Sequence, residues 1–252
     1  MGSGLGRLLS ESGHTVDSKT IICSDAEQLT DIESTFKLNA LLSKAVSEIA
    51  QSGALPVVLA GNCASSTGTL SGLHSDDMGV MWLDAHADFN TPETTQSGYL
   101  DGMALSIACG RCWKSLSRTD PRYLALGEDR VTLVGTRDLD SEEARLLKAS
   151  RIRVVTTEQL RKNNCQVPED AAPPAGDLYI HLDAGVGHAN RFASAGGLHE
   201  KEIRTLLSWA VSTYNVVALA ITAFGPGHDI DGTVREALKG IVVSTVNAMG
   251  TR

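Results

Sequence analysis

The chain has 252 residues, of which 42% are hydrophobic, and it carries a formal charge of −8 at pH 7. A chain of this length and composition can bury a large core, so we expect one α/β domain that covers residues 1–252. The negative charge argues against a nucleic-acid or anionic-membrane partner, since both select clustered Lys and Arg. It suits a small or cationic ligand better.

Targeting signals and cysteines add two expectations. No run approaches the roughly 18 apolar residues of a membrane span, and the first residues lack the apolar core of a secretion signal, so we expect a cytoplasmic protein. Five cysteines in a chain of this size should mostly be reduced thiols. Cys109 and Cys112 have the C-x-x-C spacing but lack a second metal-binding pair. Burial as small apolar side chains is favoured for them over a redox or zinc role.

Short apolar runs alternate with helical patterns along the chain. A helix over 38–50 precedes LPVVLA, GVMWLD precedes a helix near GMALSIACG, and RVTLVG precedes the helix SEEARLLKA. Further along come IRVVT with EQLRK, then the surface loop VPEDAAPPAGD, LYIHLD, the helix EKEIRTLLSWAVS, NVVALAIT, and a last helix in REALKGIVVSTVNAM. This alternation is typical of βαβ units, and it predicts a parallel sheet.

Unusual polar clusters follow five of the apolar runs. They are GNCASS, DAHADFN, TRDLD, DAGVGH and FGPGHD. In parallel sheets ligands bind at the carboxyl ends of the strands, so these clusters should meet at one edge.

One of these clusters has the composition of a metal site. Asp84, His86 and Asp88 alternate after a strand, and in an extended backbone all three side chains point to the same face. Asp183 follows another strand and should face the same edge. Converging carboxylates without a cation would be costly, so a divalent metal is the simplest explanation, and mostly oxygen ligands favour Mn²⁺ over zinc. The alternative is a turn rich in Asp that caps a helix, but it does not readily explain carboxylates at the ends of two different strands.

The stretch from Asp84 to Leu105, DAHADFNTPETTQSGYLDGMAL, resembles the arginase family's signature D-A-H-x-D-x-N-x-P-x-T-T-x-S-G-x-L-H-G. The weaker matches GNCASSTG, GTRDLD and HLD follow the family's order, so the resemblance covers residues 55–245. It implies an arginase-like fold of three layers, α/β/α, around a mostly parallel sheet.

The resemblance also implies a reaction and a set of site residues. Two Mn²⁺ ions bridged by a hydroxide would hydrolyse a guanidinium or amidino C–N bond and release urea or a urea analogue. Asp84 and Asp183 would be shared by both ions, Asp88 would bind the first and His86 the second. The residues that would hold the α-carboxylate and α-amino groups of the substrate are Asn90, Ser97 and Asp140.

Two departures from the family concern the metal loop and the proton-transfer residue. Cys63, in the stretch GNCASS, stands in place of a metal-binding His, as in Nω-hydroxy-L-arginine amidinohydrolases; it is expected as a softer ligand or as a plain buried Cys. Asp101 stands in place of a His that acts in proton transfer. It is expected as an acid or base with a raised pKa, a partner of a cationic substrate or an ordinary capping residue.

Two further departures remove carboxylates. Ala223 falls where the family places a Glu that grips the guanidinium, so an unmodified guanidinium would be held weakly. Gly185 replaces a ligand Asp of the second ion, and His188 is a weak candidate to substitute for it. One bound ion instead of two is therefore an open alternative.

Three hypotheses on function follow. The first is Mn²⁺-dependent hydrolysis of a small molecule with a guanidino-like group, such as Nω-hydroxy-L-arginine, by a monomer or small homo-oligomer. The second is a catalytically impaired protein of the same fold that holds one metal or none and acts as a binding protein. The third is another metal-assisted step, such as a lyase or cyclisation reaction, on the same scaffold.

Overall fold

A computed structural model describes residues 2–186 and 195–250. The strands of this part form one sheet in the order β1-β6-β5-β2-β3-β4, and every neighbouring pair is parallel. This confirms the parallel sheet predicted from the alternating pattern. The strands are β1 (Val57–Leu59), β2 (Gly79–Leu83), β3 (Val131–Val134), β4 (Arg153–Val155), β5 (Asp177–Asp183) and β6 (Asn215–Thr222).

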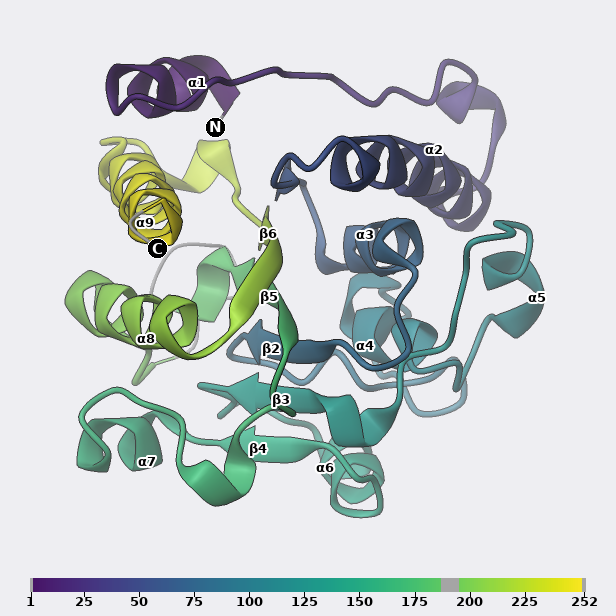
Figure 1. The fold of residues 1–252 in the computed structure, drawn as a ribbon. Coiled ribbons are helices and arrows are strands. Elements are labelled where there is room, and N and C mark those ends of the chain that lie inside the picture. Colours follow the sequence, from purple (N-terminus) through teal and green to yellow (C-terminus); the bar gives the residue numbers. More distant parts are fainter. Residues whose placement is uncertain (1, 187–194, 251–252) are drawn as a thin grey trace.

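Helices cover both faces of this sheet, which gives the expected three layers (Figure 1). On one side lie α2 (Asp31–Gln51), α3 (Ser66–Leu73), α4 (Ala104–Ala108), α5 (Lys114–Ser117) and α6 (Ser141–Lys148). On the other side lie α1 (Gly2–Glu11), α7 (Thr157–Lys162), α8 (Glu200–Thr213) and α9 (Thr233–Met249).

The core divides into two apolar clusters, one on each face of the sheet, because side chains alternate along a strand. In β2, Met81 and Leu83 belong to the cluster that includes α8 and α9, whereas Val80 and Trp82 belong to the cluster that includes α3 and α4. All of β2 is buried, as expected for a central parallel strand.

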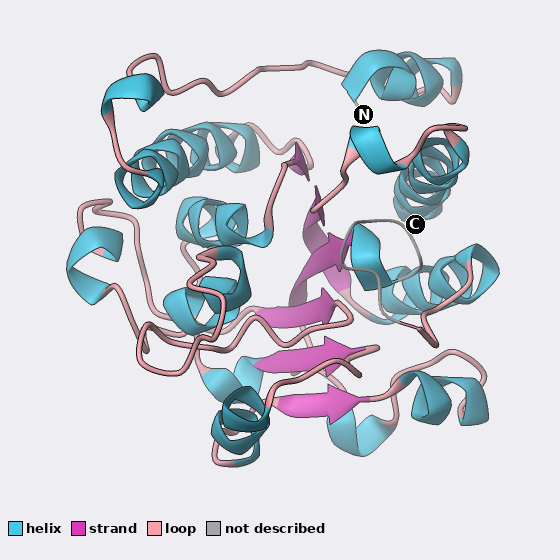
Figure 2. Cartoon of the chain, turned by 180° about the vertical axis from the view of Figure 1, so that it is seen from behind, coloured by secondary structure: helices cyan, strands magenta, loops and turns pink. Residues whose placement is uncertain are grey.

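The sheet order brings the polar clusters of the sequence together. The carboxyl ends of β1, β6, β5 and β2 lie in adjacent positions, and a view from behind shows the strands running in the same direction toward one edge (Figure 2). The loops after these strands therefore share one edge of the sheet.

Close packing of α3 against α2 fixes the segment that follows β1. A Cβ atom on Gly68 would lie 2.7 Å from the Asn39 carbonyl oxygen, and one on Gly72 would lie 2.6 Å from that of Ser43. Glycine at both positions lets the two helix backbones approach closely.

No helix in the described ranges is long and apolar enough to cross a membrane.

Candidate metal centre

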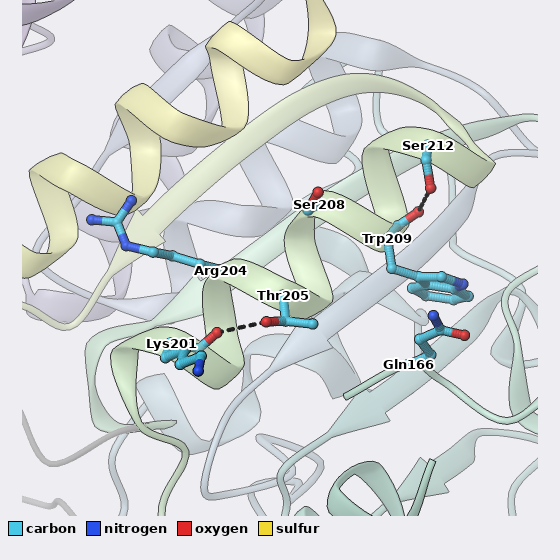
Figure 3. Close-up of a pocket in the computed structure, with 7 residues that line it drawn as sticks. All are labelled: Gln166, Lys201, Arg204, Thr205, Ser208, Trp209 and Ser212. Atoms are coloured by element: carbon cyan, nitrogen blue, oxygen red, sulfur yellow. Dashed lines mark hydrogen bonds between the residues drawn. The ribbon is translucent and has the colours of Figure 1, made fainter. Parts of the chain in front are cut away.

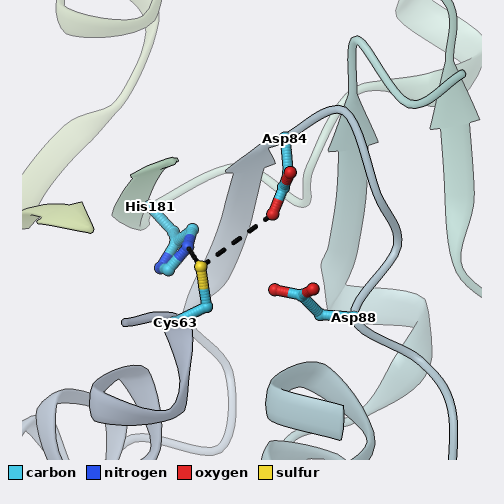
Figure 4. Close-up of side chains that lie close together, drawn as sticks. All are labelled: Cys63, Asp84, Asp88 and His181. Atoms are coloured by element: carbon cyan, nitrogen blue, oxygen red, sulfur yellow. Dashed lines mark hydrogen bonds between the residues drawn. The ribbon is translucent and has the colours of Figure 1, made fainter. Parts of the chain in front are cut away.

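A buried cluster of potential ligands lies at this edge of the sheet (Figure 4). It contains Cys63, Asp84, Asp88 and His181, whose ligand atoms all lie within 4.8 Å of one another. Asp183 joins it through Cys63, because the thiol donates to Asp183 Oδ2 over 3.0 Å. The structure thus brings together four of the five residues proposed as metal ligands and adds His181 to them.

Cys63 begins a short 3₁₀ turn, Cys63–Ser65, that leads into α3. Three side chains hold the backbone of this turn. The Ser66 hydroxyl donates to the Cys63 carbonyl oxygen at 2.7 Å, Asn39 Nδ2 donates to the Ala64 carbonyl oxygen at 2.9 Å, and Asp101 Oδ1 accepts from Ala64 N at 3.1 Å. These contacts fix the direction of the Cys63 side chain.

The segment after β2 does not follow the expected extended backbone. The chain bends at Ala85 and His86, and Asp88 adopts a left-handed conformation with φ 51°. Asp84 and Asp88 still converge, but through this bend and not through strand alternation.

His86 lies at the rim of the cluster, beside Asp84. Its side chain is 33% exposed, and its Nδ1 lies 3.4 Å from Asp84 Oδ1, which also accepts from the His86 backbone N at 3.0 Å. On its other side, Nε2 lies 3.8 Å from a carboxylate oxygen of Asp138. Because the hydrogen bond to Asp84 favours the protonated ring, the pKa of His86 is raised.

Strand β5 supplies His181 and Asp183, which share one face because they are two residues apart. His181 Nε2 lies 3.3 Å from Cys63 Sγ and 3.1 Å from the Thr222 hydroxyl. Asp183 Oδ1 accepts a short hydrogen bond from Gly185 N. Reasoning from the sequence did not assign a role to His181, although its two-residue spacing from Asp183 was a signal that could have done so.

The protonation of the cluster reflects its burial. Burial, reinforced by neighbouring carboxylates, holds the pKa of Cys63, Asp88 and Asp183 well above their ordinary values. It also raises the pKa of Asp101 to about 6 and lowers the pKa of His181 to about 3. Without a cation, Cys63, Asp88, Asp183 and His181 therefore favour their neutral forms, since burial disfavours charge and buried like charges repel.

The residues present fit a divalent cation. Asp88 Oδ2 is buried and has no hydrogen-bond partner among the described residues, although such an oxygen normally has one. It belongs to a set that offers one sulfur, one nitrogen and several carboxylate oxygens at close range. A cation would supply the missing partner and would stabilise the ionised forms of these acidic groups.

The residues expected to hold an amino acid substrate occupy the loop after Asp88. Asn90 Nδ2 donates to Asp140 Oδ2 at 2.8 Å, so the structure joins this pair. Asp140 Oδ1 also accepts from the backbone N of Glu142 and Glu143 at the start of α6. Ser97 lies on the exposed part of the loop, where its hydroxyl accepts from Tyr99 N.

The positions that lack a family carboxylate differ in their surroundings. Ala223 directly follows β6 and has a positive φ of 53°, and it packs against the apolar cluster that contains Trp82. Gly185 contributes only its backbone, through the bond to Asp183. His188, the candidate substitute for the missing carboxylate, lies outside the described residues.

The Cys109 and Cys112 pair lies apart from this centre, near the end of α4, and both are free thiols. Burial raises the pKa of Cys112 to about 12 and that of Cys109 further. A thiol held in its protonated form is a poor nucleophile, which agrees with the expectation of buried small side chains.

A surface hollow on the outer side of α8 offers little chemistry by comparison (Figure 3). Its lining includes Lys201, Arg204 and Trp209. Arg204 is engaged by Glu200 and by the Gly240 carbonyl oxygen, and none of the lining residues belongs to the ligand cluster.

Glu143 fixes the loop that carries Asp88, and we expect it to make the stability of the protein depend on pH. Its Oε1 accepts from Phe89 N at 2.8 Å, and burial raises its pKa to about 7 from an ordinary 4.5. With the folded value above the unfolded one, its contribution is complete below pH 4.5 and is lost as pH rises through about 7.

We therefore expect Glu143→Gln to lessen the fall in stability between pH 4.5 and about 7 by about 3 kcal/mol, because each pKa unit corresponds to about 1.4 kcal/mol. Gln keeps an acceptor for Phe89 N. Urea unfolding of metal-free protein at several pH values measures the effect, and Glu142→Gln on the exposed side of α6 is the control. If the free energy of unfolding depends on pH equally in wild type and Glu143→Gln, then Glu143 is not held in its protonated form in the folded protein.

Comparisons with known proteins were made for the sequence and for the fold. The family model described as Arginase family matches residues 5–246. The arginase of Bacillus subtilis (strain 168) is 32% identical over 160 residues, which are 60% of this chain and 54% of that protein. The Nω-hydroxy-L-arginine amidinohydrolase of Streptomyces lavendulae is 35% identical over 142 residues, 56% of this chain and 48% of that one. The matched segment spans about half the length of these curated relatives.

Solved structures agree in fold over a larger part of the chain. An arginase structure from Bacillus subtilis superposes with a TM-score of 0.84 at 24% identity, over 98% of this chain and 89% of that one. An arginase from Bacillus cereus gives 0.83 at 22% identity, over 98% and 88%. At these identities the likeness establishes the three-layer fold.

Proposed function

Because this chain belongs to the arginase family, we propose that it is a metal-dependent hydrolase that cleaves a C–N bond of a small molecule with a guanidino or modified-guanidino group. The observation that carries this proposal is the buried cluster of Cys63, Asp84, Asp88 and Asp183 at the carboxyl ends of β1, β2 and β5. Burying several acidic groups, one of them with an unpaired oxygen, lowers the free energy of unfolding unless a cation binds among them.

The family resemblance indicates Mn²⁺ as the cation, with up to two ions per chain. Cys63, Asp84, Asp88 and Asp183 would hold the first ion. His86, together with Asp84 and Asp183, would hold the second. When bound, such ions act as Lewis acids and lower the pKa of water toward neutrality.

The chain's own side chains would position the substrate and move protons. The linked pair Asn90 and Asp140, with Ser97 on the same loop, would bind the amino acid end of the substrate. In hydrolysis, water adds its oxygen to the amidino carbon, the C–N bond breaks, and the leaving nitrogen takes a proton. Asp101, with Oδ1 fixed by Ala64 N, would carry that proton on its other carboxylate oxygen.

The substrate class follows from the departures near the site. Ala223 offers no charge to grip a plain guanidinium, which weakens recognition of unmodified arginine. Cys63 in place of a metal-binding His resembles the amidinohydrolase branch of the family. The Nω-hydroxy-L-arginine amidinohydrolase of Streptomyces lavendulae is 35% identical over its matched segment. We therefore propose Nω-hydroxy-L-arginine as the preferred substrate.

A product assay tests this choice. Metal-free protein is reloaded with Mn²⁺ and incubated with Nω-hydroxy-L-arginine, L-arginine or agmatine, and the release of hydroxyurea or urea is followed. We expect kcat/KM to be highest for the hydroxylated substrate. Absence of product from all three substrates, in protein shown to hold metal, contradicts the proposed hydrolysis; faster turnover of plain arginine contradicts only the substrate preference.

Asp101→Asn tests the proton-transfer role. General acid–base catalysis contributes about 10²–10⁴-fold, so we expect kcat to fall by at least about a hundredfold. The pH profile of kcat should also lose the limb that the titration of Asp101 produces. Asn preserves the acceptor for Ala64 N, so a role limited to holding the turn predicts near-normal kcat and an unchanged profile.

A second candidate function is a binding protein of the same fold that holds one metal or none. Gly185 favours it, because the second cation position lacks a side chain there, and Ala223 removes a substrate contact. Retained metal with tight binding of a guanidino ligand but no product would support this alternative over the hydrolase.

A further inference from the structure

His181 is placed inside the ligand cluster by its strand. It lies in the buried part of β5, is fully inaccessible to solvent, and directs Nε2 toward Cys63 Sγ at 3.3 Å. Figure 4 shows its ring and the Cys63 sulfur facing each other, with the Asp84 and Asp88 carboxylates on the opposite side of the sulfur.

The orientation of the imidazole is fixed from two sides. The Trp82 ring stacks on it with centroids 3.7 Å apart and planes 13° apart. The Tyr179 hydroxyl lies 3.3 Å from Nδ1. When the Nδ1 proton is donated to Tyr179, the Nε2 lone pair points into the cluster, which is the arrangement that supports histidines bound to metals.

A second observation points to a ligand at this place. Asp88 Oδ2 is buried and has no hydrogen-bond partner in the described part of the chain, and Asp88 shares the 4.8 Å cluster with His181. One cation among these groups would satisfy the orphaned oxygen and accept the His181 lone pair at once.

We infer that His181 is a metal ligand, and that with Cys63, Asp84 and Asp88 it forms a sulfur, nitrogen and oxygen site that takes Zn²⁺ or Co²⁺ ahead of Mn²⁺. The inference rests on the proposed function only in its premise that this centre holds a divalent cation. Thiolate and imidazole suit zinc and cobalt, whereas Mn²⁺ is better served by carboxylates and water. Cys63 and His181 together therefore shift the preference of the first cation position.

The competing explanation is a plain hydrogen-bonded network of His181, Cys63 and Thr222 that packs the core. This network leaves Asp88 Oδ2 unpaired. The two explanations differ in the effect that replacing His181 has on metal binding. If His181 is a ligand, its replacement weakens the binding of the cation; if it only packs the core, the affinity for the cation stays the same.

The first test compares metal binding by wild type, His181→Asn and Cys63→Ser. Metal-free proteins are titrated with Zn²⁺, Mn²⁺ and Co²⁺, and the Co²⁺ spectrum is recorded. Each variant should bind Zn²⁺ at least about tenfold more weakly and should lose zinc preference over Mn²⁺ by a similar factor, as is usual near a metal centre. Cys63→Ser alone should lose the sulfur-to-cobalt charge-transfer band. His74→Asn, at an exposed histidine, is the control.

A second measurement avoids disturbing β5. His86→Ala, at the rim of the site, leaves His181 as the imidazole of the cluster, and zinc-edge X-ray absorption of this variant with one equivalent of Zn²⁺ should show one sulfur and one imidazole. A zinc shell of oxygen and sulfur without imidazole, or an unchanged zinc affinity in His181→Asn, overturns the inference. Lack of hydrolysis with any cation, together with the expected shift in zinc affinity, contradicts the proposed function alone.

Discussion

Replacing Asp84 with asparagine is expected to lower kcat/KM by at least about a thousandfold. Asp84 lies between the two proposed cation positions: its Oδ1 contacts His86, and its Oδ2 lies 4.0 Å from Cys63 Sγ. Losing this shared carboxylate removes metal from the centre. Because a metal ion contributes several kcal/mol of transition-state stabilisation, the corresponding loss in rate is about three powers of ten or more.

The control for this experiment is Asp77→Asn, at an exposed carboxylate before β2. The substrate assay and a metal count are run on the same preparations, with circular dichroism to verify the fold. Asn is nearly isosteric with Asp, so the metal-free variant should fold. Activity within tenfold of wild type in Asp84→Asn would contradict the assignment of the centre.

The second large effect concerns the stability of Asp88→Asn relative to wild type. We expect this variant to be more stable than wild type without metal and less stable than wild type with metal. In the metal-free protein, the buried Asp88 carboxyl has an unpaired oxygen, and burial raises its pKa. Asn cannot ionise, so we expect the metal-free variant to be more stable than wild type at neutral pH, where the raised pKa of Asp88 costs the wild type stability. With a saturating cation, Asp88 becomes a ligand, and the variant should be less stable than wild type.

The pH dependence of this effect has a definite direction. The raised pKa means that folded Asp88 keeps its proton over a range where the unfolded chain loses it, so wild type loses stability as pH rises above the unfolded value. The advantage of Asp88→Asn in metal-free protein should therefore grow from acid to neutral pH and vanish near pH 4. Thermal unfolding with and without metal measures both effects, with exposed Asp76→Asn as control. A variant that is destabilised equally in both states would indicate ordinary packing at Asp88.

The fold could be predicted to a large extent from the sequence. Buried parallel strands such as β2 and β5 are continuous apolar runs, and the intervening helices carry periodic apolar faces, so the α/β class and the edge that carries the polar loops followed from periodicity. The order of the strands depends on long-range pairing, which local pattern does not contain.

The candidate site could be predicted in part. The convergence of Cys63, Asp84, Asp88 and Asp183 followed from their positions after strands that proved to be neighbours. The predicted extended backbone through His86 was wrong, because the chain bends there and Asp88 takes a positive φ. Such a conformation in a residue other than glycine is uncommon and is set by tertiary contacts.

Other features of the site arise from contacts that are distant in sequence. His181 reaches Cys63 across 118 residues, and Glu143 reaches the Phe89 backbone across 54. Asp101 was expected near the substrate, and its observed contact is the backbone of the Cys63 turn, 37 residues away. Spacing within one segment carries no information about such pairs.

The central claim is that the buried cluster holds the cation on which hydrolysis depends. The most direct test is to count metal ions per chain by elemental analysis after dialysis, and to measure product release on the same sample before chelation, after chelation and after metal is restored. We expect at least one tightly held divalent ion per chain, loss of product release on chelation, and recovery on reloading. A chain that retains no ion under saturating conditions, or that hydrolyses the substrate equally well after chelation, would contradict the account.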